Sequence, residues 1–321
     1  MTAPSRTVRR RPFLQLDVFA DAPQRGNPLA VVLEADGLSD AEMQRIAQWT
    51  NLSETTFLLA PTAAGADYRV RIWTPSGELP FAGHPTLGTA RAWLHAGGAP
   101  TGERIVQECG VGLVEVRCPG LGTDAGPQLA FAAPPLLREG PLEEDEVDAI
   151  AATLGVDRGA VRGHTWADNG PGWQVVELED AEQVLALVPD VIALGERKLG
   201  VIGRYDGASR GAAAGTAGAD AAGADANGAG SADADADDAR DAPLYEVRAF
   251  VPVGVEDPVT GSLNAGIGQW LVGRGEAPRR WTAAQGTVLG REGRISLERE
   301  EDGTLWVGGA TVLTVEGTIL A

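Results

Sequence analysis

The segment YRVRIWTPSGELPFAGHPTLGTARAWL at residues 68–94 aligns without a gap with YEVRAFVPVGVEDPVTGSLNAGIGQWL at residues 245–271. Each segment begins with tyrosine and closes with Trp-Leu. In both, an alternating apolar and polar run passes through a Pro/Gly turn and a glycine-containing loop into a helical pattern. A repeat of this length predicts that the chain is built from two duplicated halves.

A second, shorter similarity lies upstream of each copy. AEMQRIA at 41–47 resembles DEVDAIA at 145–151, and both patterns predict an amphipathic helix. Ser39 and Glu42 have the spacing of a capping box, which marks the start of the first helix, and Gly155 is a suitable end for the second. Two similarities in the same order favour duplication over chance.

Many short β-like runs surround these helices, which predicts an α+β protein. We expect two similar lobes, each a curled, mostly antiparallel sheet around a central helix, with the active site in the cleft between them. The expected parts are an N-terminal tail at 1–11, a first lobe at 12–127 joined by the C-terminal strand 310–321, and a second lobe at 128–309. An insert at 206–242 interrupts the second lobe.

The composition of the insert differs from that of the rest of the chain. Ala, Gly and Asp make up 31 of its 37 residues, and no apolar side chain larger than alanine occurs in it. Such a segment cannot bury enough surface to offset the entropy of ordering it. We therefore expect a disordered loop insertion, and the sequence assigns it no role.

Net charge, hydropathy and cysteine content exclude several classes of binding partner and location. A net charge of −19 argues against nucleic acid and anionic membranes, because both need a basic surface. No apolar run approaches the ~20 residues of a transmembrane helix, and no apolar stretch follows the basic N-terminus, so we expect a cytoplasmic protein. Cys109 and Cys118 form no CxxC pair and no histidine cluster joins them, so we predict no metal site.

Polar loops lead into the helix in both copies of the repeat. A helix N-terminus offers free N–H groups and about half a positive charge, so each loop is suited to hold an anion. The first helix is expected to begin at Thr86, directly after His84 and a proline; the loop before the second contains Asp257, Thr260 and Ser262. Taken singly, each residue also fits an ordinary turn or cap. Matched loops in a repeat favour a site for a small molecule that carries a carboxylate.

Four segments together resemble the PhzF family, whose members share the diaminopimelate epimerase-like fold. They are QLDVFADAPQRGNPLAVVL (15–33), NLSETTFLL (51–59), FAGHPTLGTA (81–90) and EDPVTGSLNAGIGQWL (256–271). The resemblance covers nearly the whole chain apart from the tail and the insert. It implies a homodimeric acid/base isomerase that uses no metal and no organic cofactor.

The resemblance also implies catalytic residues. The carboxylate of the SET motif is Glu54, the histidine of the GHP motif is His84, and the aspartate of the EDP motif is Asp257. Glu54 would take a proton from one substrate carbon and return it to another, while His84 and Asp257 hold the amino and hydroxyl groups. The reaction known in the family isomerises trans-2,3-dihydro-3-hydroxyanthranilate on the way to phenazines.

Four further residues are implied to bind substrate. Ser262 and the backbone at Gly83 and Gly261 would hold the substrate carboxylate, and Ser53 would line the same pocket. Related epimerases place two opposed thiols at the helix mouths. Because Ala82 and, approximately, Thr260 stand there in this chain, a two-thiol epimerase is not expected.

Two other classes of function compete with this reading. A serine hydrolase would use Ser262, His84 and Asp257, but the chain has no GxSxG elbow. A non-catalytic small-molecule-binding or scaffold protein would keep the fold without needing all three candidate catalytic residues. The physiological substrate stays open.

Overall fold

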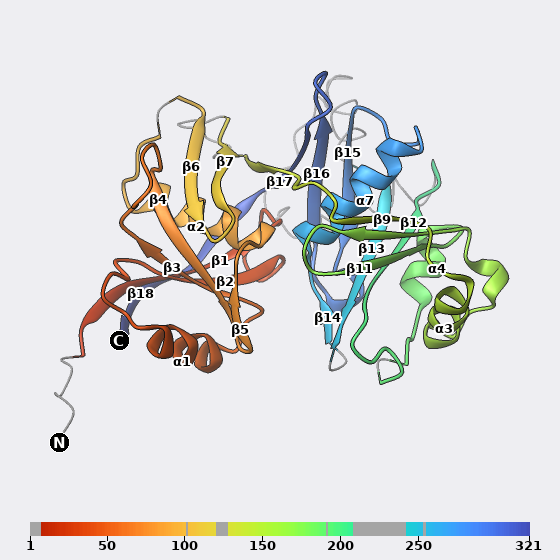
Figure 1. Cartoon of the computed structure of the whole chain (residues 1–321), viewed down its shortest axis with the longest axis horizontal. Coiled ribbons are helices and arrows are strands. Elements are labelled where there is room, and N and C mark those ends of the chain that lie inside the picture. Colours follow the sequence, from red (N-terminus) through yellow and green to blue (C-terminus); the bar gives the residue numbers. More distant parts are fainter. Residues whose placement is uncertain (1–7, 101, 120–127, 191, 208–241, 253–254) are drawn as a thin grey trace, which may run out of the picture. The chain divides into compact units, whose positions relative to one another are not determined.

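The computed structural model describes residues 8–100, 102–119, 128–190, 192–207, 242–252 and 255–321 (Figure 1). Residues 1–7 of the expected tail and 208–241 of the expected insert lie outside the described residues. Two compact units emerge, one within Met1–Ala132 and Gly309–Ala321, the other within Ala133–Gly308. None of the described helices is long and apolar enough to cross a membrane.

The first unit combines eleven elements of the described chain. They are β1 (Arg10–Val18), β2 (Asn27–Val32), α1 (Asp40–Thr50), β3 (Thr55–Leu59), β4 (Tyr68–Thr74), β5 (Gly77–Leu79), α2 (Gly83–His95), β6 (Arg104–Cys109), β7 (Gly112–Arg117), β8 (Leu129–Ala132) and β18 (Thr311–Leu320). The strands pair in the order β18, β1, β2, β3, β4, β6, β7, β8, and β5 forms a hairpin with β4. Within this order, β2–β3 and β4–β6 are parallel and the other neighbours are antiparallel.

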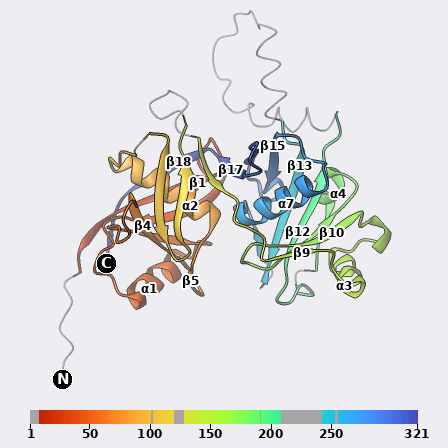
Figure 2. The same cartoon turned by 45° about the horizontal axis from the view of Figure 1, so that its top comes forward.

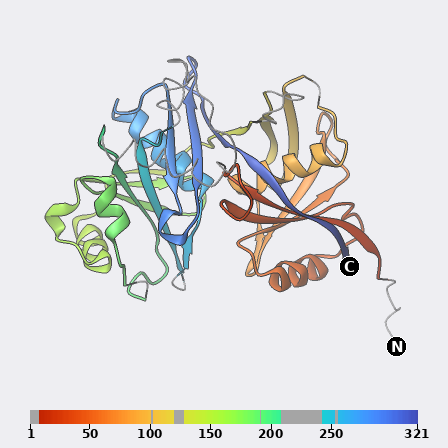
Figure 3. The ribbon, with the colours of Figure 1, turned by 180° about the vertical axis from the view of Figure 1, so that it is seen from behind.

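Helix α2 is the central helix of this unit. It packs against β1, β2, β3, β4, β6, β7 and β8 as well as β18. Strand β18, from the far end of the sequence, pairs antiparallel with β1 from Arg10 opposite Leu320 to Val18 opposite Thr311 (Figure 3). The two ends of the described chain therefore complete the sheet around α2.

The second unit repeats this order of strands. Its elements are β9 (Arg138–Gly140), α3 (Glu144–Leu154), η1 (Arg158–Ala160), β10 (Gly163–Asp168), β11 (Trp173–Glu177), α4 (Ala181–Ala186), β12 (Lys198–Arg204), β13 (Tyr245–Val251), β14 (Val255–Asp257), α7 (Gly261–Gly273), β15 (Arg280–Gln285), η3 (Thr287–Leu289), β16 (Gly293–Arg299) and β17 (Leu305–Gly309). The strand order is β9, β10, β11, β12, β13, β15, β16, β17, with β14 in a hairpin with β13. The parallel pairs, β11–β12 and β13–β15, occupy the places of β2–β3 and β4–β6. The predicted α+β class with mostly antiparallel sheets is confirmed.

The repeated hairpins carry the same ion pair. The guanidinium of Arg71 in β4 donates to both carboxylate oxygens of Glu78 in β5, each at 2.6 Å. Arg248 in β13 donates to both oxygens of Glu256 in β14 at 2.9 and 2.7 Å. In both hairpins the arginine lies two residues before the residue directly opposite the glutamate, which is Trp73 or Phe250, so the two ion pairs hold equivalent positions.

The gapless alignment is wrong by one residue beyond the hairpin turn. Thr74 pairs with Gly77 across a two-residue turn, whereas Val251 pairs with Val255 across a three-residue turn. The offset between equivalent residues is therefore 177 before the turn and 178 after it. Helix α7, at Gly261–Gly273, matches α2 at the larger offset.

The shorter upstream similarity does not reflect duplication. Both helices form: α1 has the predicted Ser39–Glu42 capping box, and α3 ends at Gly155 in the left-handed conformation. However, α1 lies between β2 and β3, and the helix between the equivalent strands β11 and β12 is α4. Helices α1 and α4 also pack on equivalent strands, β3 and β4 in one unit, β12 and β13 in the other. The resemblance of α1 to α3 is the general pattern of a capped amphipathic helix.

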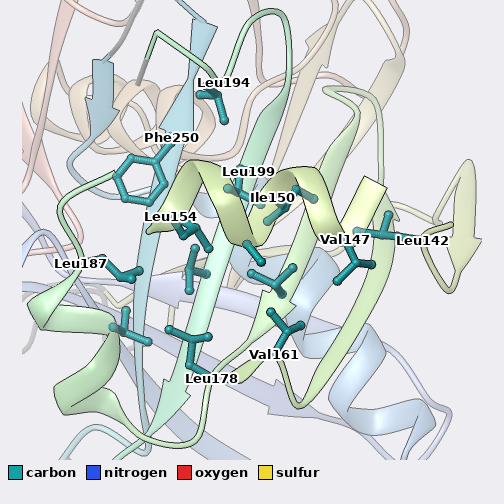
Figure 4. Close-up of a cluster of buried hydrophobic side chains, with 14 residues drawn as sticks. Leu142, Val147, Ile150, Leu154, Val161, Leu178, Leu187, Leu194, Leu199 and Phe250 are labelled. Atoms are coloured by element: carbon teal, nitrogen blue, oxygen red, sulfur yellow. The ribbon is translucent and has the colours of Figure 1, made fainter. Parts of the chain in front are cut away.

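Two helices cover opposite faces of strand β12 in the second unit. Leu199 and Val201 belong to a buried apolar cluster with Ile150 and Leu154 of α3 (Figure 4). Gly200, between them, points to the other face, where an added Cβ would lie 2.4 Å from the Leu263 side chain of α7. Figures 1 and 2 show α3 and α7 as separate helices of this unit. The sheet is therefore packed on both sides at this strand.

Helix α7 approaches β10 so closely that its position 266 requires glycine. A Cβ at Gly266 would lie 2.7 Å from the carbonyl oxygen of Ala167. We expect Gly266→Ala to lower the free energy of unfolding by about 1–3 kcal/mol, because helix or strand must shift. Gly273→Ala on the same helix is the control, since its Cβ meets no atom within 4 Å. Urea unfolding followed by circular dichroism checks this, and equal midpoints for the two variants would contradict it.

Candidate functional site

Glu54 and His84 meet in the first unit. Glu54 immediately precedes β3, and His84 is the second residue of α2. The imidazole Nε2 of His84 lies 3.4 Å from the Oε2 of Glu54, and the two side chains are 6% and 15% exposed. His84 Nε2 makes no hydrogen bond within the described part of the chain. The structure thus places a carboxyl and an imidazole side by side in a largely enclosed position.

Helix α2 begins three residues before the predicted Thr86. Its first residue is Gly83, and its N-cap, Ala82, supplies no side-chain hydrogen bond. Pro85 is compatible with this early start because N–H groups of the first turn have no partner inside the helix. The earlier start brings His84 into the helix, where it is only 5% exposed.

Buried hydroxyl groups fix the segments that carry this pair. Thr89 of α2 donates from its Oγ1 to the Oγ1 of Thr56 in β3 at 2.9 Å, and both residues are fully buried. Thr50, at the end of α1, shares a hydrogen bond of 2.7 Å with Thr55, the first residue of β3. Between α1 and β3 the chain turns at Asn51, which adopts the left-handed conformation. Glu54 therefore lies on a short connection held at both ends.

Burial keeps the His84 imidazole neutral. Loss of hydration disfavours the charged form and lowers the pKa of His84 from 6.5 to about 3. A neutral imidazole can donate from one ring nitrogen and accept at the other. Beside a carboxyl group, it is suited to orient a polar partner without adding positive charge.

The remaining residues predicted for this end of the first unit differ in exposure. Gly83 is buried at the start of α2, so its N–H is one of the free donors of the first helical turn. Ser53, next to Glu54, is exposed.

Asp257 and Thr260 meet in the second unit. Asp257 ends β14, and its Oδ2 accepts a hydrogen bond of 2.5 Å from the Oγ1 of Thr260, the N-cap residue of α7. Thr260 does not cap the helix with its side chain. Its hydroxyl instead donates a hydrogen bond to the carboxylate of Asp257.

Gly261 and Ser262 form the first turn of α7. The Ser262 Oγ accepts a hydrogen bond of 3.1 Å from the indole Nε1 of Trp173, and the Ser262 carbonyl accepts one of 2.8 Å from Asn169. Because an indole N–H only donates, the Ser262 hydroxyl proton remains available to a ligand oxygen. An indole is also no base, so this contact gives no support to Ser262 as a hydrolase nucleophile.

Three polar residues near these positions were not predicted from the sequence. Trp173 and Asn169 contact Ser262, and the buried Gln285 contacts both Asp257 and Thr260. The sequence carried no signal for Gln285, because the strand register matches it with no glutamine of the first unit: Gln107 pairs with Tyr68, whereas Gln285 pairs with Val247, two residues beyond Tyr245. Among the described residues, no group of three or more His, Cys, Asp or Glu side chains could hold a metal ion.

Comparisons with known proteins identify the family. The family model PhzC-PhzF, described as phenazine biosynthesis-like protein, matches residues 16–317. Antisense-enhancing sequence 1 of Schizosaccharomyces pombe is 33% identical over 95% of this chain and 97% of its own length. Trans-2,3-dihydro-3-hydroxyanthranilate isomerase of Pseudomonas chlororaphis is 58% identical, but over 25% of this chain and 28% of its own length.

A solved structure shares the fold. The crystal structure of a predicted epimerase from Pseudomonas aeruginosa superposes with a TM-score of 0.71 at 25% identity, over 97% of this chain and 99% of that one. The predicted fold is thereby confirmed, and relatives named isomerase or epimerase place the chain among enzymes of the isomerase type. The family model spans nearly the whole chain, and a full-length relative is one-third identical to it. The chain therefore belongs to the PhzF family of phenazine biosynthesis-like proteins.

Proposed function

We propose that this protein is an isomerase that moves a proton within a small cyclic amino or hydroxy acid, with Glu54 as the base. The observation that carries the proposal is the 3.4 Å contact between Glu54 and His84 at the start of α2. Burial lowers the pKa of His84 to about 3, so the imidazole is a hydrogen-bond partner rather than a proton acceptor near neutral pH. This leaves the Glu54 carboxylate to take the proton.

In this mechanism one proton leaves a substrate carbon, resides on Glu54 and returns to a different carbon of the same molecule. The double bond shifts accordingly, and the substrate neither gains nor loses atoms. His84 would hold a polar group of the substrate through its imidazole. The free N–H groups of Gly83 and His84 would attract the substrate carboxylate, because they lie at the positive end of α2.

The same proposal gives roles to residues of the second unit. Asp257 would hold an amino or hydroxyl group, and Ser262, whose hydroxyl proton is free to donate, would bind the carboxylate with the N–H of Gly261. An acyl-transfer function receives no comparable support. A homodimer and a cytoplasmic location stay predictions.

Solvent exchange tests the function directly. We expect the protein in D₂O to introduce deuterium into trans-2,3-dihydro-3-hydroxyanthranilate or into a related member of a panel of cyclic amino acids, because the abstracted proton exchanges with solvent on the base. Proton NMR of the recovered compounds is the measurement.

The alternative is a non-catalytic binding or scaffold protein of the same fold. It predicts that panel members bind, as detected by calorimetry, while the carbon-bound protons are retained. Binding without exchange for every member would contradict the isomerase proposal.

A further inference from the structure

Gln285 has every hydrogen-bonding position of its amide occupied. It is the last residue of β15 and fully buried. Its Oε1 accepts from the backbone N–H of Thr260 at 3.0 Å and from the Nδ2 of Asn264 at 2.8 Å. Its Nε2 donates to the carbonyl of Asp257 at 3.0 Å and to the Oγ1 of Thr260 at 2.9 Å. An amide can make four such bonds, and Gln285 makes all of them.

These partners fix the direction of the amide. The Thr260 N–H can only donate, so Oε1 must face it, and the Asp257 carbonyl can only accept, so Nε2 must face that group. The Thr260 hydroxyl oxygen therefore accepts a hydrogen bond from the Nε2 of Gln285. Its single hydrogen is then directed to the Oδ2 of Asp257, at 2.5 Å.

The two hydrogen bonds therefore run in one direction: Gln285 donates to Thr260, and Thr260 donates to Asp257. A distance of 2.5 Å is typical of a hydroxyl donating to an ionised carboxylate. Such a bond favours the ionised form of the acid. Asn264 adds a brace, since its Nδ2 also donates to the Thr260 carbonyl at 3.0 Å.

The first unit also has a buried glutamine that contacts its central helix, but without the acid. Gln107 in β6 is fully buried, but it lies two residues from the register position of Gln285, because Gln285 pairs with Val247 whereas Gln107 pairs with Tyr68. Its Nε2 donates to Thr86 in the first turn of α2 at 3.0 Å, and its Oε1 accepts from Tyr68 at 3.0 Å. The places of Thr260 and Asp257 hold Ala82 and Leu79. In both units a buried glutamine thus contacts the first turn of the central helix. Among these residues, only Thr260 of the second unit donates a hydroxyl hydrogen bond to a carboxylate.

We propose that Thr260 and Gln285 are positioning residues that hold Asp257 as an oriented, ionised hydrogen-bond acceptor for substrate. This rests on the proposed function, in which Asp257 binds a polar group of the substrate. Thr260 supplies the donor to Asp257. Gln285 acts one step further away by setting the direction in which the Thr260 hydroxyl points.

Gln285→Glu is the most informative variant. It changes the direction of the hydrogen bond between residue 285 and Thr260, while the shape of the side chain stays almost the same. An ionised glutamate at 285 offers no donor, so the Thr260 hydroxyl would donate to it and leave Asp257. Thr260→Val removes the hydroxyl, and Thr260→Ser restores it. Gln107→Glu is the control, since it alters a buried glutamine that contacts the start of the other central helix, where no carboxylate follows.

The first measurement needs no substrate. We expect a downfield, slowly exchanging hydroxyl resonance in the proton NMR spectrum of the full chain, assigned by its loss in Thr260→Val. It should persist in Thr260→Ser and Gln107→Glu, and it should change its chemical shift in Gln285→Glu, where the hydroxyl donates to the new carboxylate and no longer to Asp257. An unchanged chemical shift in a folded Gln285→Glu protein would overturn the proposed direction of these hydrogen bonds.

The second measurement is deuterium exchange with the substrate that the panel identifies. Thr260→Val and Gln285→Glu should lower kcat/KM by about 10- to 100-fold, the effect of losing a hydrogen bond to a charged group. Thr260→Ser should recover to within about threefold. A kcat/KM of Thr260→Val equal to that of the unaltered chain would overturn the positioning role. If the unaltered chain exchanges no substrate, the proposed function fails, whereas the resonance still tests the donor chain.

Discussion

Glu54→Gln is expected to lower the rate of solvent deuterium incorporation by more than about 100-fold while the protein stays folded. The amide keeps the shape of the carboxylate but cannot accept a proton as a base. Loss of a base typically costs 10²–10⁴-fold, and 100-fold corresponds to about 2.7 kcal/mol in the barrier. If Glu54 acted only by a polar contact, glutamine would largely replace it, and the loss would be nearer ~1–2 kcal/mol.

His84→Asn is the companion to this variant. Because His84 is assigned a holding role, its replacement should weaken substrate binding more than it slows proton transfer. Exchange rates at saturating substrate, together with affinities from calorimetry, separate the two effects. Normal exchange by Glu54→Gln would show that another residue is the base, with Asp257 the next candidate.

The free energy of unfolding is expected to fall steeply in acid because of His84. Its pKa is 6.5 in an unfolded chain and is lowered by burial to about 3 in the fold. Between these values the unfolded chain binds a proton that the folded chain does not. The stability contributed by the neutral imidazole is therefore complete above pH 6.5 and is lost as the pH falls toward 3.

The pH dependence of the free energy of unfolding that arises from His84 is limited by the binding of a single proton. The slope from His84 is at most about 1.4 kcal/mol per pH unit over this window. The Glu54 oxygen at 3.4 Å favours a charged imidazole when ionised and so reduces the slope from that limit. Urea titrations from pH 4 to 7 should give a smaller slope for His84→Gln than for the unaltered chain.

His95→Gln provides the comparison for that experiment. His95 ends the same helix, but its side chain is 33% exposed, in contrast to 6% for His84. The comparison separates the effect of burial from the loss of an imidazole in general. Equal slopes for the unaltered chain and His84→Gln would contradict the assignment of acid sensitivity to His84.

The sequence by itself determined the local elements and the family. Alternation of apolar residues located the strands, and the Ser39–Glu42 spacing located the start of α1. These signals can be read because they depend on neighbouring residues, through strand periodicity and capping of the helix's own N–H groups. The same locality explains the wrong correspondence of α1 with α3, since any capped amphipathic helix carries that pattern.

Long-range structure was decided by tertiary hydrogen bonds. The one-residue shift between the halves arises at a turn of two residues in one hairpin and three in the other, which the pairing of Val251 with Val255 reveals. The sequence similarity on both sides of the turn is too weak to place a single inserted residue. Only the strand register settles which residue of α7 corresponds to which residue of α2.

The candidate site shows the same division. The motifs pointed to Glu54, His84 and Asp257, but the 3.4 Å contact and the low pKa of His84 arise from β3 and α2 packing together and excluding water. Gln285 escaped prediction because a glutamine in a strand carries no local signal of its role. Its function depends on which donors and acceptors surround it once the chain has folded, and those partners come from segments about 20 to 30 residues away in the sequence.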